Sequence, residues 1–545
     1  MPAGLTDAAP PAARTATHTG HSWFLLIAVS VAGLMVRAIP VVVADFPVND
    51  GGLFVAMTRA IMDAGWALPA TVAWNGTDLP FIYPPGGFYL AGALDAVPGV
   101  DLLAVFRWLP LFASSLVVPA VYLLAREVLR SDGAAPSAVA ALAAALAYAL
   151  APASWVWLIQ GGGVTRAAGM LLAVLTLWLL VRLVRSPNRR GVVAVGVLAG
   201  LTALVHPGAA VFAAVSGVLI WVFEGRSRTS LRAAAGSASV ALLVVAPWLL
   251  VVLPRVGIAA LLEVPSNGPD PAAAALALLA GRYTGLPFID PLAVVALAVA
   301  ILQVVRRRFL LPLWLLAGLA LSYQYAMVPF GLLIGVAVMD LAAFRRQMAD
   351  TPTTARRATA VMGVLLGLAF VFVGAASVAT VRNPGAPVHA LSPERREAMA
   401  RLADLQPARV AVITDSVWNS DADSEWFPLL TASVSVATVQ GSELRGRSAF
   451  QAQVEAHDAL QGCVRPASVS CVEAWLADHA GELLYLPKGP LHGPSSPDDC
   501  CADLREALRA DARSACPGFL ILYDSAGATI LIVADLVRPP VAGCQ

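Results

Sequence analysis

Long apolar segments recur along the first 380 or so residues of the chain, and they constrain its fold more than any other feature. About 20 apolar residues are enough for a helix to cross a bilayer with all of its backbone groups hydrogen-bonded. Eleven crossings are expected, at residues 22–44, 102–125, 136–157, 164–184, 191–206, 207–224, 235–254, 290–305, 309–324, 326–344 and 358–381. A mean hydropathy of +0.74 agrees with this. The sequence predicts a polytopic α-helical membrane protein.

The arginines predict how the chain is threaded through the membrane. They gather at five places between the apolar segments: Arg126 with Arg130, 182–190, 226–232, 306–308 and 345–357. Cytoplasmic loops carry an excess of positive charge, and all five clusters face the cytoplasm if the amino end lies inside. The segments flanking His206-Pro-Gly208 then form a hairpin with its turn outside. Residues 1–21 are expected to form a disordered cytoplasmic N-terminal segment. Everything after about residue 382 is expected on the extracytoplasmic side of the membrane.

The overall charge is balanced, with 36 basic and 35 acidic side chains and a net charge of +1. Proteins that bind nucleic acid usually carry a basic face or tail, and nothing here indicates one. We therefore expect membrane lipid to be a partner and nucleic acid not to be. The bias toward Ala, Gly, Val and Arg suggests a bacterial plasma-membrane protein.

All of the cysteines lie in the C-terminal part of the chain, at Cys463, Cys471, Cys500, Cys501, Cys516 and Cys544. An even set confined to one segment indicates disulfides in an oxidising compartment, which agrees with the predicted outer location. Buried free thiols are the alternative. The connectivity is open, although the adjacent pair Cys500 and Cys501 is not expected to bond to itself.

Two outer loops and a C-terminal domain complete the expected organisation. The loops cover residues 45–101, with short helices at 51–66 and 85–97, and residues 255–290, with an Ala/Leu-rich helix. Residues 382–545 read as an extracytoplasmic α/β domain that contains the cysteines. Its expected strands are 409–414, 519–523 and 529–533, and its expected helices lie around 451–460 and 472–480.

Two aspartates, Asp45 and Asp50, follow the first apolar segment directly and lie at the mouth of a membrane helix. An acidic side chain at a membrane face is costly to desolvate, which favours a functional role. The alternative is structural, because Asn49 or Asp50 before Gly-Gly-Leu-Phe can cap a helix. Both interpretations remain open from the sequence.

Several short motifs in this order resemble the GT-C superfamily of glycosyltransferases that use lipid-linked sugars. A first span ending near Arg37 is followed by the acidic loop, a helix at 51–66 and Phe81-Ile-Tyr-Pro-Pro-Gly-Gly-Phe-Tyr89. Further similarities are Leu123-Leu-Ala-Arg126, Ala246-Pro-Trp248 and Leu311-Pro-Leu-Trp314. Protein mannosyltransferases and aminoarabinose transferases are members. The resemblance covers roughly residues 22–345 and concerns the superfamily, not the substrate.

The resemblance implies transfer of a sugar from a polyprenyl-phosphate donor to an acceptor glycan, lipid or protein outside the membrane, usually with inversion. An aspartate of the first outer loop acts as the base in such enzymes. Asp50 matches that position better than Asp45, and a partly desolvated carboxylate suits the role. Many relatives have a second acid beside the first, whereas Asn49 and Gly51 flank Asp50 here. We therefore expect no cofactor and no metal, with a divalent cation as the alternative.

The phosphate of such a donor needs N–H donors or a cation near the outer leaflet. Gly161-Gly-Gly-Val-Thr-Arg166 offers both at the start of a helix, although an interfacial arginine on a flexible turn is the plainer interpretation. The remaining candidates for substrate binding are Arg37, Tyr83, His206, Arg282 and Tyr283. Three of them have a structural alternative: Arg37 can snorkel, Tyr83 can fix a turn before prolines, and His206 can belong to a Pro-Gly turn.

The outer domain also carries acids near aromatic residues, at Asp421–Pro428 and Val439–Glu443. Such pairs are suited to carbohydrate, and equally to loop capping and core packing. By contrast, Tyr323-Gln-Tyr325 lacks the arginine that relatives often have there. Two other classes of protein compete with a glycosyltransferase: a lipid or polysaccharide transporter, and a non-catalytic protein of envelope assembly. A transporter is expected to show repeated halves and mid-bilayer charges, and neither is evident.

Overall fold

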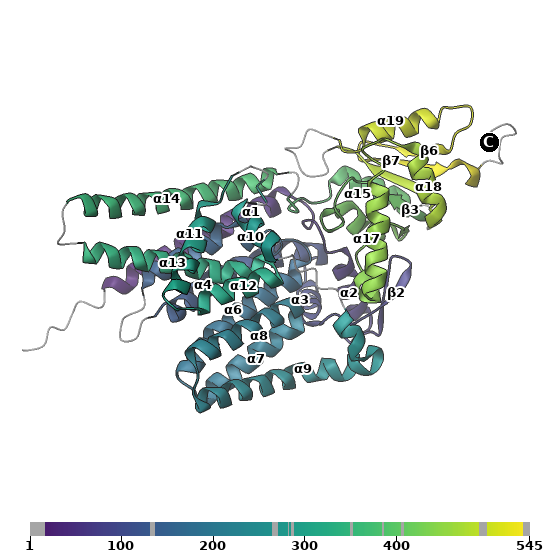
Figure 1. Ribbon diagram of the computed structural model, residues 1–545. Coiled ribbons are helices and arrows are strands. Elements are labelled where there is room, and N and C mark those ends of the chain that lie inside the picture. Colours follow the sequence, from purple (N-terminus) through teal and green to yellow (C-terminus); the bar gives the residue numbers. More distant parts are fainter. Residues whose placement is uncertain are drawn as a thin grey trace, which may run out of the picture.

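The computed structural model describes residues 17–130, 137–263, 271–281, 283–284, 288–348, 353–383, 386–404, 408–489 and 499–537. Two parts are visible in Figure 1: a bundle of long helices and a smaller mixed α/β part at one end of it. The predicted cytoplasmic N-terminal segment at residues 1–21 lies almost entirely outside the described residues.

Each of the eleven apolar segments falls on a helix. Their bounds are α1 (Thr17–Val43), α4 (Leu102–Val128), α5 (Ala138–Leu150), α6 (Gly163–Arg185), α7 (Arg189–Val205), α8 (Pro207–Glu224), α9 (Arg228–Glu263), α11 (Pro291–Val305), α12 (Leu310–Leu321), α13 (Tyr323–Gln347) and α14 (Thr353–Arg382). In the described part of the chain, seven of these are long and apolar enough to cross a membrane by themselves: α1, α4, α6, α8, α9, α13 and α14. The chain is therefore a multi-pass membrane protein.

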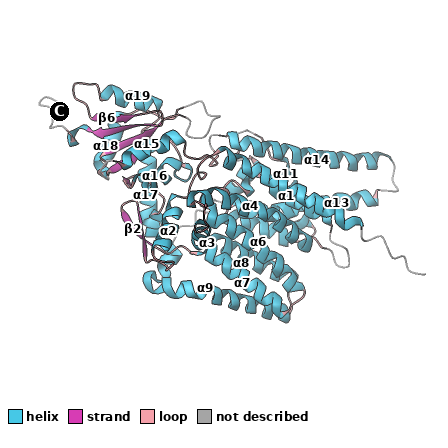
Figure 2. Cartoon of the chain, turned by 180° about the vertical axis from the view of Figure 1, so that it is seen from behind, coloured by secondary structure: helices cyan, strands magenta, loops and turns pink. Residues whose placement is uncertain are grey.

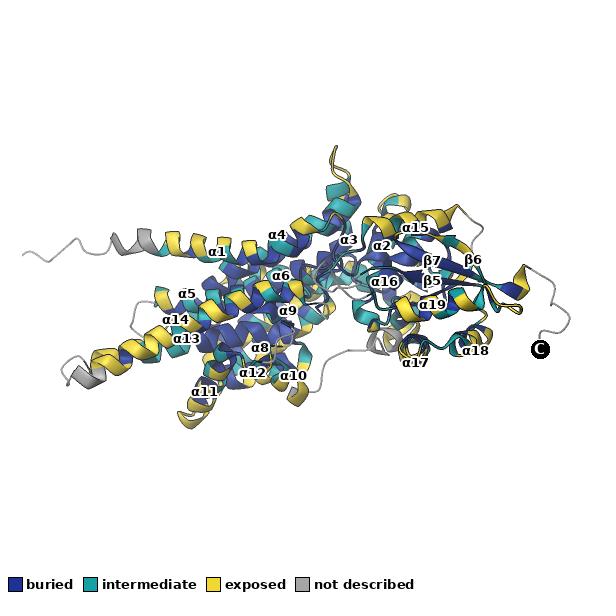
Figure 3. Cartoon of the chain, turned by 90° about the horizontal axis from the view of Figure 1, so that it is seen from above, coloured by how far each residue is buried: buried dark blue, intermediate teal, exposed yellow. Residues whose placement is uncertain are grey.

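Small residues let the central helices approach closely. The sequence of α5 is largely alanine and leucine, and α5 packs on α13. A side chain at Gly331 of α13 would lie 2.7 Å from the carbonyl oxygen of Ala144, so only glycine permits this contact. The outer faces of α1, α9 and α14 remain apolar and exposed (Figure 3), as expected of surfaces that contact lipid rather than water.

Ion pairs join the arginine-bearing ends of neighbouring helices. Arg185 of α6 pairs with Glu224 of α8 at 2.8 Å, and Arg306, just after α11, pairs with Asp340 of α13 at 2.6 Å. These charged groups lie at the helix ends away from the α/β part. The charges thus gather at one end of the bundle. The loops that connect the helices at the other end can form a site.

The first long loop is ordered and compact. It contains α2 (Gly52–Asp63), an antiparallel hairpin of β1 (Thr71–Trp74) and β2 (Thr77–Pro80), and α3 (Gly86–Asp95). Both expected helices are present, whereas the hairpin was not anticipated. In the second long loop, α10 (Pro271–Leu279) is the expected Ala/Leu-rich helix.

The C-terminal part is built on a five-stranded mixed sheet with the order β4-β3-β5-β7-β6. The strands are β3 (Arg409–Val412), β4 (Val434–Ser435), β5 (Leu483–Pro487), β6 (Phe519–Asp524) and β7 (Ala528–Val533); β3 pairs in parallel with β4 and β5, and β7 pairs antiparallel with β5 and β6. The helices are α15 (Pro393–Ala403), α16 (Ala422–Thr431), α17 (Arg447–Gln461), α18 (Val469–His479) and α19 (Ala502–Asp511). Figure 2 shows the strands at the far end from α13. The three expected strands and two expected helices are all found.

The cysteines form disulfides, and one pairing corrects the sequence-based expectation. Cys463 bonds to Cys471, and Cys500 bonds to its neighbour Cys501. Consecutive Cα atoms are 3.8 Å apart, closer than most disulfides allow, which is why this bond was not expected. The turn that leads into α19 brings the two side chains together. Cys516 is also disulfide-bonded, and Cys544 lies outside the described residues.

The C-terminal part is fixed to the first outer loop by paired hydrogen bonds. At the turn between β1 and β2, Asn75 Nδ2 donates to the carbonyl of Ser435 at 2.8 Å, and the Ser435 N–H donates to Asn75 Oδ1 at 2.7 Å. Trp74 Nε1 donates to the carbonyl of Gln440 at 2.9 Å. These contacts hold β4 and the segment after it against the loop.

Candidate active site

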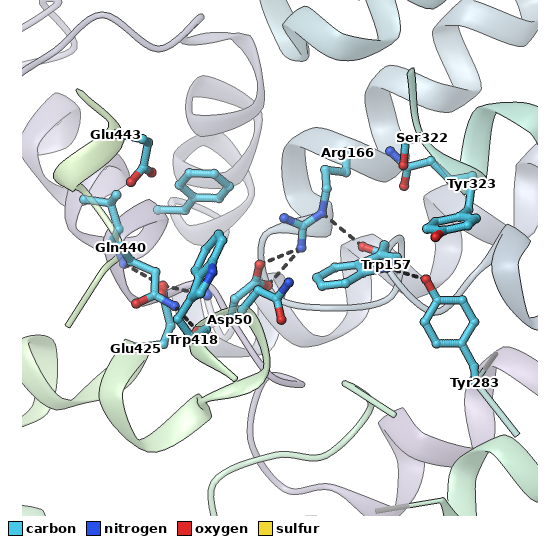
Figure 4. A pocket seen from close by; sticks show the side chains of 15 residues that line it. Asp50, Trp157, Arg166, Tyr283, Ser322, Tyr323, Trp418, Glu425, Gln440 and Glu443 are labelled. Atoms are coloured by element: carbon cyan, nitrogen blue, oxygen red, sulfur yellow. Dashed lines mark hydrogen bonds and ion pairs between the residues drawn. The ribbon is translucent and has the colours of Figure 1, made fainter. Parts of the chain in front are cut away.

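A cavity of about 370 Å³ opens where the C-terminal part meets the helix ends opposite the arginine clusters. It is lined by Asp50, Gly51, Leu53, Phe54, Trp157, Arg166, Tyr283, Ser322, Tyr323, Gln324, Trp418, Asn419, Glu425, Gln440 and Glu443. Figure 4 shows Asp50 and Arg166 in the middle of this set. Its size falls in the range of small-molecule sites. Residues from five separate stretches of the chain thus converge on one aspartate.

The backbone around Asp50 is held in an unusual conformation. Asn49 has φ +53° and Gly51 has φ +133°, and the latter favours glycine. The Asn49 N–H donates to the carbonyl of His389 at 2.7 Å, and Trp426 Nε1 donates to the carbonyl of Asn49 at 2.8 Å. Both partners follow α14, so the C-terminal part fixes the shape of the loop that carries Asp50.

The Asp50 carboxylate lies against the start of α6. Arg166 donates to Asp50 Oδ2 at 2.7 Å and to Oδ1 at 3.0 Å, and the Gly162 N–H donates to Oδ1 at 2.8 Å. A side chain at Gly161 would lie 2.0 Å from the Asp50 carbonyl oxygen, so this approach requires glycine. The side chains of Asp50 and Arg166 are about one-fifth exposed. The glycine-rich turn therefore places N–H donors and a guanidinium beside the carboxylate.

Asp50 does not cap α2, which was the structural alternative that the sequence suggested. The N-cap position of α2 is Gly51, which has no side chain to do so. Instead, Glu425 of α16 reaches across: its Oε1 accepts from the Gly51 N–H at 3.2 Å and from the Leu53 N–H at 3.4 Å. A carboxylate at a helix N-terminus is favoured by the helix dipole. The cap of α2 therefore comes from the C-terminal part.

Glu425 and Glu443 form an acidic wall across the cavity from Arg166. Burial raises the pKa of Glu425 well above its usual value, and the nearby charge of Asp50 raises it further. Burial also raises the pKa of Glu443, whose Oε2 accepts from the Gly441 N–H at 2.8 Å. Both groups can therefore hold a proton at a higher pH than an exposed glutamate can.

Aromatic side chains line the opposite, membrane side of the cavity. Trp157 precedes α6 and donates from Nε1 to the hydroxyl of Tyr283 at 2.8 Å, while its carbonyl accepts from Arg166 Nε at 3.0 Å. The Arg166 guanidinium lies 6.0 Å from the Trp157 ring centre. Tyr323 completes this wall at the start of α13 (Figure 4). Trp157 thus orients both the cation and Tyr283.

The candidate residues from the sequence separate into two groups. Asp50, Arg166 and Tyr283 meet at the cavity. Tyr83 lies next to it: its hydroxyl is 3.3 Å from Thr165 Oγ1, and burial raises its pKa to about 12. Arg282 lies outside the described residues.

Three other candidates are not among the described residues that line the cavity. Asp45 is 58% exposed and forms an ion pair with Arg396 of α15. Arg37 is fully buried inside the bundle, where it donates to the carbonyl of Ala149 at 2.8 Å and to Ser154 Oγ at 3.1 Å. His206 caps α8 by accepting from the Ala209 N–H at 3.1 Å. Each of these side chains therefore has a structural partner.

The described acidic side chains near the cavity are not arranged as ligands for a divalent cation. Throughout the described ranges, no group of three or more His, Cys, Asp or Glu side chains is arranged to hold a metal ion. The carboxylate of Asp50 faces an arginine, and Glu425 faces backbone N–H groups.

Several lining residues were missed by sequence reasoning. Trp157 belongs to no motif, and Gln440 lies within Val439–Glu443 without being one of its acids; only the fold of the chain brings these two residues to Asp50. Glu425 and Glu443 had been noted as acids near aromatics, but nothing local distinguished carbohydrate contact from loop capping. Gln324 and Tyr323 belong to the segment whose missing arginine had argued against a role in the site.

Comparisons with known proteins agree with this architecture. The sequence profile of the dolichyl-phosphate-mannose-protein mannosyltransferase family matches residues 83–251. Among curated proteins, none has a significant sequence match to the chain.

Two solved structures share the fold. One is the archaeal oligosaccharyltransferase AglB from Archaeoglobus fulgidus, in complex with an inhibitory peptide and a dolichol-phosphate; the TM-score is 0.52 at 12% identity, over 86% of this chain and 70% of that one. The other is the arabinofuranosyltransferase AftD from Mycobacteria, with a TM-score of 0.51 at 15% identity, over 93% of this chain and 40% of that one.

The chain shares its fold with these two membrane glycosyltransferases, and a mannosyltransferase profile matches part of it. The matching segment, residues 83–251, is similar to the dolichyl-phosphate-mannose-protein mannosyltransferase family. The resemblance found from the short motifs is confirmed.

Proposed function

We propose that this protein transfers a sugar from a polyprenyl-phosphate donor to an acceptor on the outer face of the membrane, with inversion, and that Asp50 is the base. The observation that carries the proposal is the Asp50–Arg166 pair in a cavity at the helix ends where the C-terminal part docks. The mannosyltransferase profile and the dolichol-phosphate bound to AglB support the donor class.

The proposed topology has eleven crossings with the amino end in the cytoplasm. Seven long helices and the shorter apolar helices α5, α11 and α12 support it, and α7 connects the arginine-rich end to the outer turn before α8. Residues 22–381 then form the membrane domain, and residues 382–545 form an extracytoplasmic domain. The disulfides support that location, since they persist in oxidising compartments.

In the proposed reaction, Arg166 and the N–H groups at the start of α6 bind the donor phosphate. The phosphate then competes with Asp50 for Arg166, which leaves a carboxylate oxygen available for the acceptor. Asp50 takes the proton of the acceptor hydroxyl as the hydroxyl oxygen bonds to the anomeric carbon. The bond between that carbon and the phosphate oxygen breaks, and polyprenyl phosphate leaves with the electron pair.

The test compares Asp50→Asn with Asp45→Asn. Purified full-length protein is incubated with radiolabelled polyprenyl-phosphate sugars and envelope fractions, and both donor consumption and labelled product are measured. Loss of a general base lowers the rate about 10²–10⁴-fold, and we expect Asp50→Asn to do so. Asp45→Asn removes an equivalent carboxylate outside the cavity and is expected to keep near wild-type activity.

Undiminished transfer by Asp50→Asn would show that the base is another group. If the wild type consumes none of the donors, the proposed donor class is wrong.

A further inference from the structure

The wall of the cavity contributed by the C-terminal part has its own chemical character. It consists of Trp418, Asn419, Glu425, Gln440 and Glu443. We propose that this wall is the acceptor subsite and that it binds a neutral sugar, whose attacking hydroxyl lies between Asp50 and Glu425. The inference rests on the proposed function and names the class of its acceptor.

The first argument comes from buried oxygen atoms that have no partner. Within the described chain, Glu425 Oε2, Gln440 Oε1 and Gln324 Oε1 are buried and accept no hydrogen bond, and all three residues line the cavity. Glu425 is only 3% exposed. Buried polar atoms normally have partners, because an unsatisfied one costs about 1–3 kcal/mol. A ligand that fills the cavity is the natural source of the missing hydrogen bonds.

The second argument is the kind of atoms left without a partner. Gln440 Oε1 on this wall and Gln324 Oε1 on the membrane side accept hydrogen bonds, and Glu425 Oε2 accepts one when ionised and donates one when protonated. They need a ligand with several groups close together that both donate and accept. A sugar offers hydroxyl groups on successive carbons, whereas a serine or threonine side chain offers only one. The pattern of unpartnered atoms therefore favours a sugar over a peptide side chain as the group that occupies this wall.

The third argument is the position of Trp418. Its ring packs edge-on against Phe450, with ring centres 5.4 Å apart, and its carbonyl accepts from Gln440 Nε2 at 2.9 Å. Trp418 is half-buried and lies between Glu425 and Asp50 in Figure 4. A fixed aromatic ring beside hydrogen-bonding groups gives a flat apolar surface with a polar rim, which suits the two kinds of surface on a sugar ring.

The fourth argument concerns charge. Arg166 is the single cation among the described residues that line the cavity, and it lies on the membrane side with Asp50. Among its described residues, the C-terminal wall has no cation. An acidic acceptor would find no opposite charge there, and an unpaired charge in a partly buried site costs free energy. The acceptor sugar is therefore neutral.

The experiment separates acceptor binding from donor chemistry. Binding of octyl glycosides of mannobiose, galactobiose and arabinobiose to the full-length protein is measured by calorimetry, beside an octyl glucuronide and a Ser/Thr-rich peptide. Transfer from radiolabelled polyprenyl-phosphate sugars to the same five probes is then measured. We expect at least one neutral disaccharide to bind and to be glycosylated, and the glucuronide and the peptide to do neither.

Two variants locate the subsite. Glu425→Gln keeps an oxygen for the Gly51 and Leu53 N–H groups, so the loop stays folded, and Trp418→Ala removes the ring. Both are expected to raise the acceptor KM or Kd tenfold or more and to leave the donor KM within twofold. The matched control is Glu455→Gln, an exposed glutamate on α17 outside the cavity, which is expected to behave as wild type.

The proposal is overturned if no neutral disaccharide binds, if the peptide or the glucuronide is the preferred acceptor, or if neither variant changes acceptor binding. These outcomes differ from failure of the proposed function, in which no donor is consumed. Calorimetry measures acceptor binding without any transfer. The acceptor inference can therefore be tested independently of the donor.

Discussion

The two walls of the cavity differ in what they offer a ligand. The membrane side presents a guanidinium, backbone N–H groups at a helix start and two tyrosines, which suit a phosphate and the sugar attached to it. The C-terminal side presents carboxylates, amides and a tryptophan, which suit hydroxyl groups. Asp50 lies between them. In the proposed function, each half of the protein recognises one substrate and the reaction occurs where the two halves meet.

The largest loss of transfer activity that would test this difference is expected for Arg166→Gln, which removes the cation on the membrane side of the cavity. We expect the donor KM to rise and kcat to fall, with a combined loss of about 100-fold in kcat/KM, since a charge-assisted contact to phosphate is lost. Arg255→Gln is the control, because Arg255 lies outside the cavity and donates to the loop carbonyls of Leu68 and Pro69. The measurement is steady-state transfer at varied donor concentration.

A double variant sharpens this result. Asp50 and Arg166 contact each other, so Asp50→Asn with Arg166→Gln is expected to lose much less than the product of the two single losses. Strictly multiplicative losses would mean that the two residues act independently, contrary to the proposed site.

The next effect, a fall in kcat of about fivefold, is expected for Trp426→Phe. The change keeps an aromatic ring in a smaller form and removes the N–H that holds the Asn49 carbonyl, and one buried hydrogen bond is worth about 1 kcal/mol. We expect kcat to fall while the KM for each substrate changes little. Trp475→Phe makes the same chemical change in the C-terminal core, where Nε1 donates to Ala456 at 2.9 Å. It is expected to lower the melting temperature but not kcat.

Glu425→Gln is expected to change the pH dependence of stability. Since burial raises the pKa of Glu425, the folded protein keeps a proton that the unfolded chain releases, and its stability falls as the pH rises from the usual glutamate pKa through the raised one. Glutamine removes this loss. The variant is therefore expected to gain melting temperature over wild type at pH 8 and little at pH 4, as measured by thermal unfolding in detergent.

Glu455→Gln serves as the control here too, with no pH-dependent gain expected. An equal gain at both pH values would show that the carboxyl of Glu425 is not responsible.

The smallest effect is expected for Arg396→Gln, which breaks the exposed pair with Asp45. Such surface pairs contribute about 0–1 kcal/mol, so transfer is expected to stay within twofold of wild type and the melting temperature within a few degrees. A large loss of transfer would place Asp45 in the reaction and would contradict its assignment outside the cavity.

The sequence predicted the helices well and the site only in part. Hydrophobic length located all eleven apolar helices, because that signal is local. Asp50 and Arg166 were found because each belongs to a short motif. Trp418, Glu425 and Gln440 belong to the C-terminal part, and their meeting with Asp50 depends on long-range docking that no local pattern reveals. The short strand β4 and the disulfide between Cys500 and Cys501 were missed for the same reason: tertiary contacts, not local preference, determine them.

The role of Asn75 has a practical consequence for producing this protein. The sequence Asn75-Gly-Thr77 is an acceptor site for N-linked glycosylation in a eukaryotic secretory pathway. Both polar atoms of the Asn75 amide are engaged with the backbone of Ser435. An oligosaccharide attached there during expression in yeast or insect cells would prevent the C-terminal part from seating on the hairpin. Bacterial hosts avoid this modification, and Thr77→Ala removes the site while leaving the amide in place.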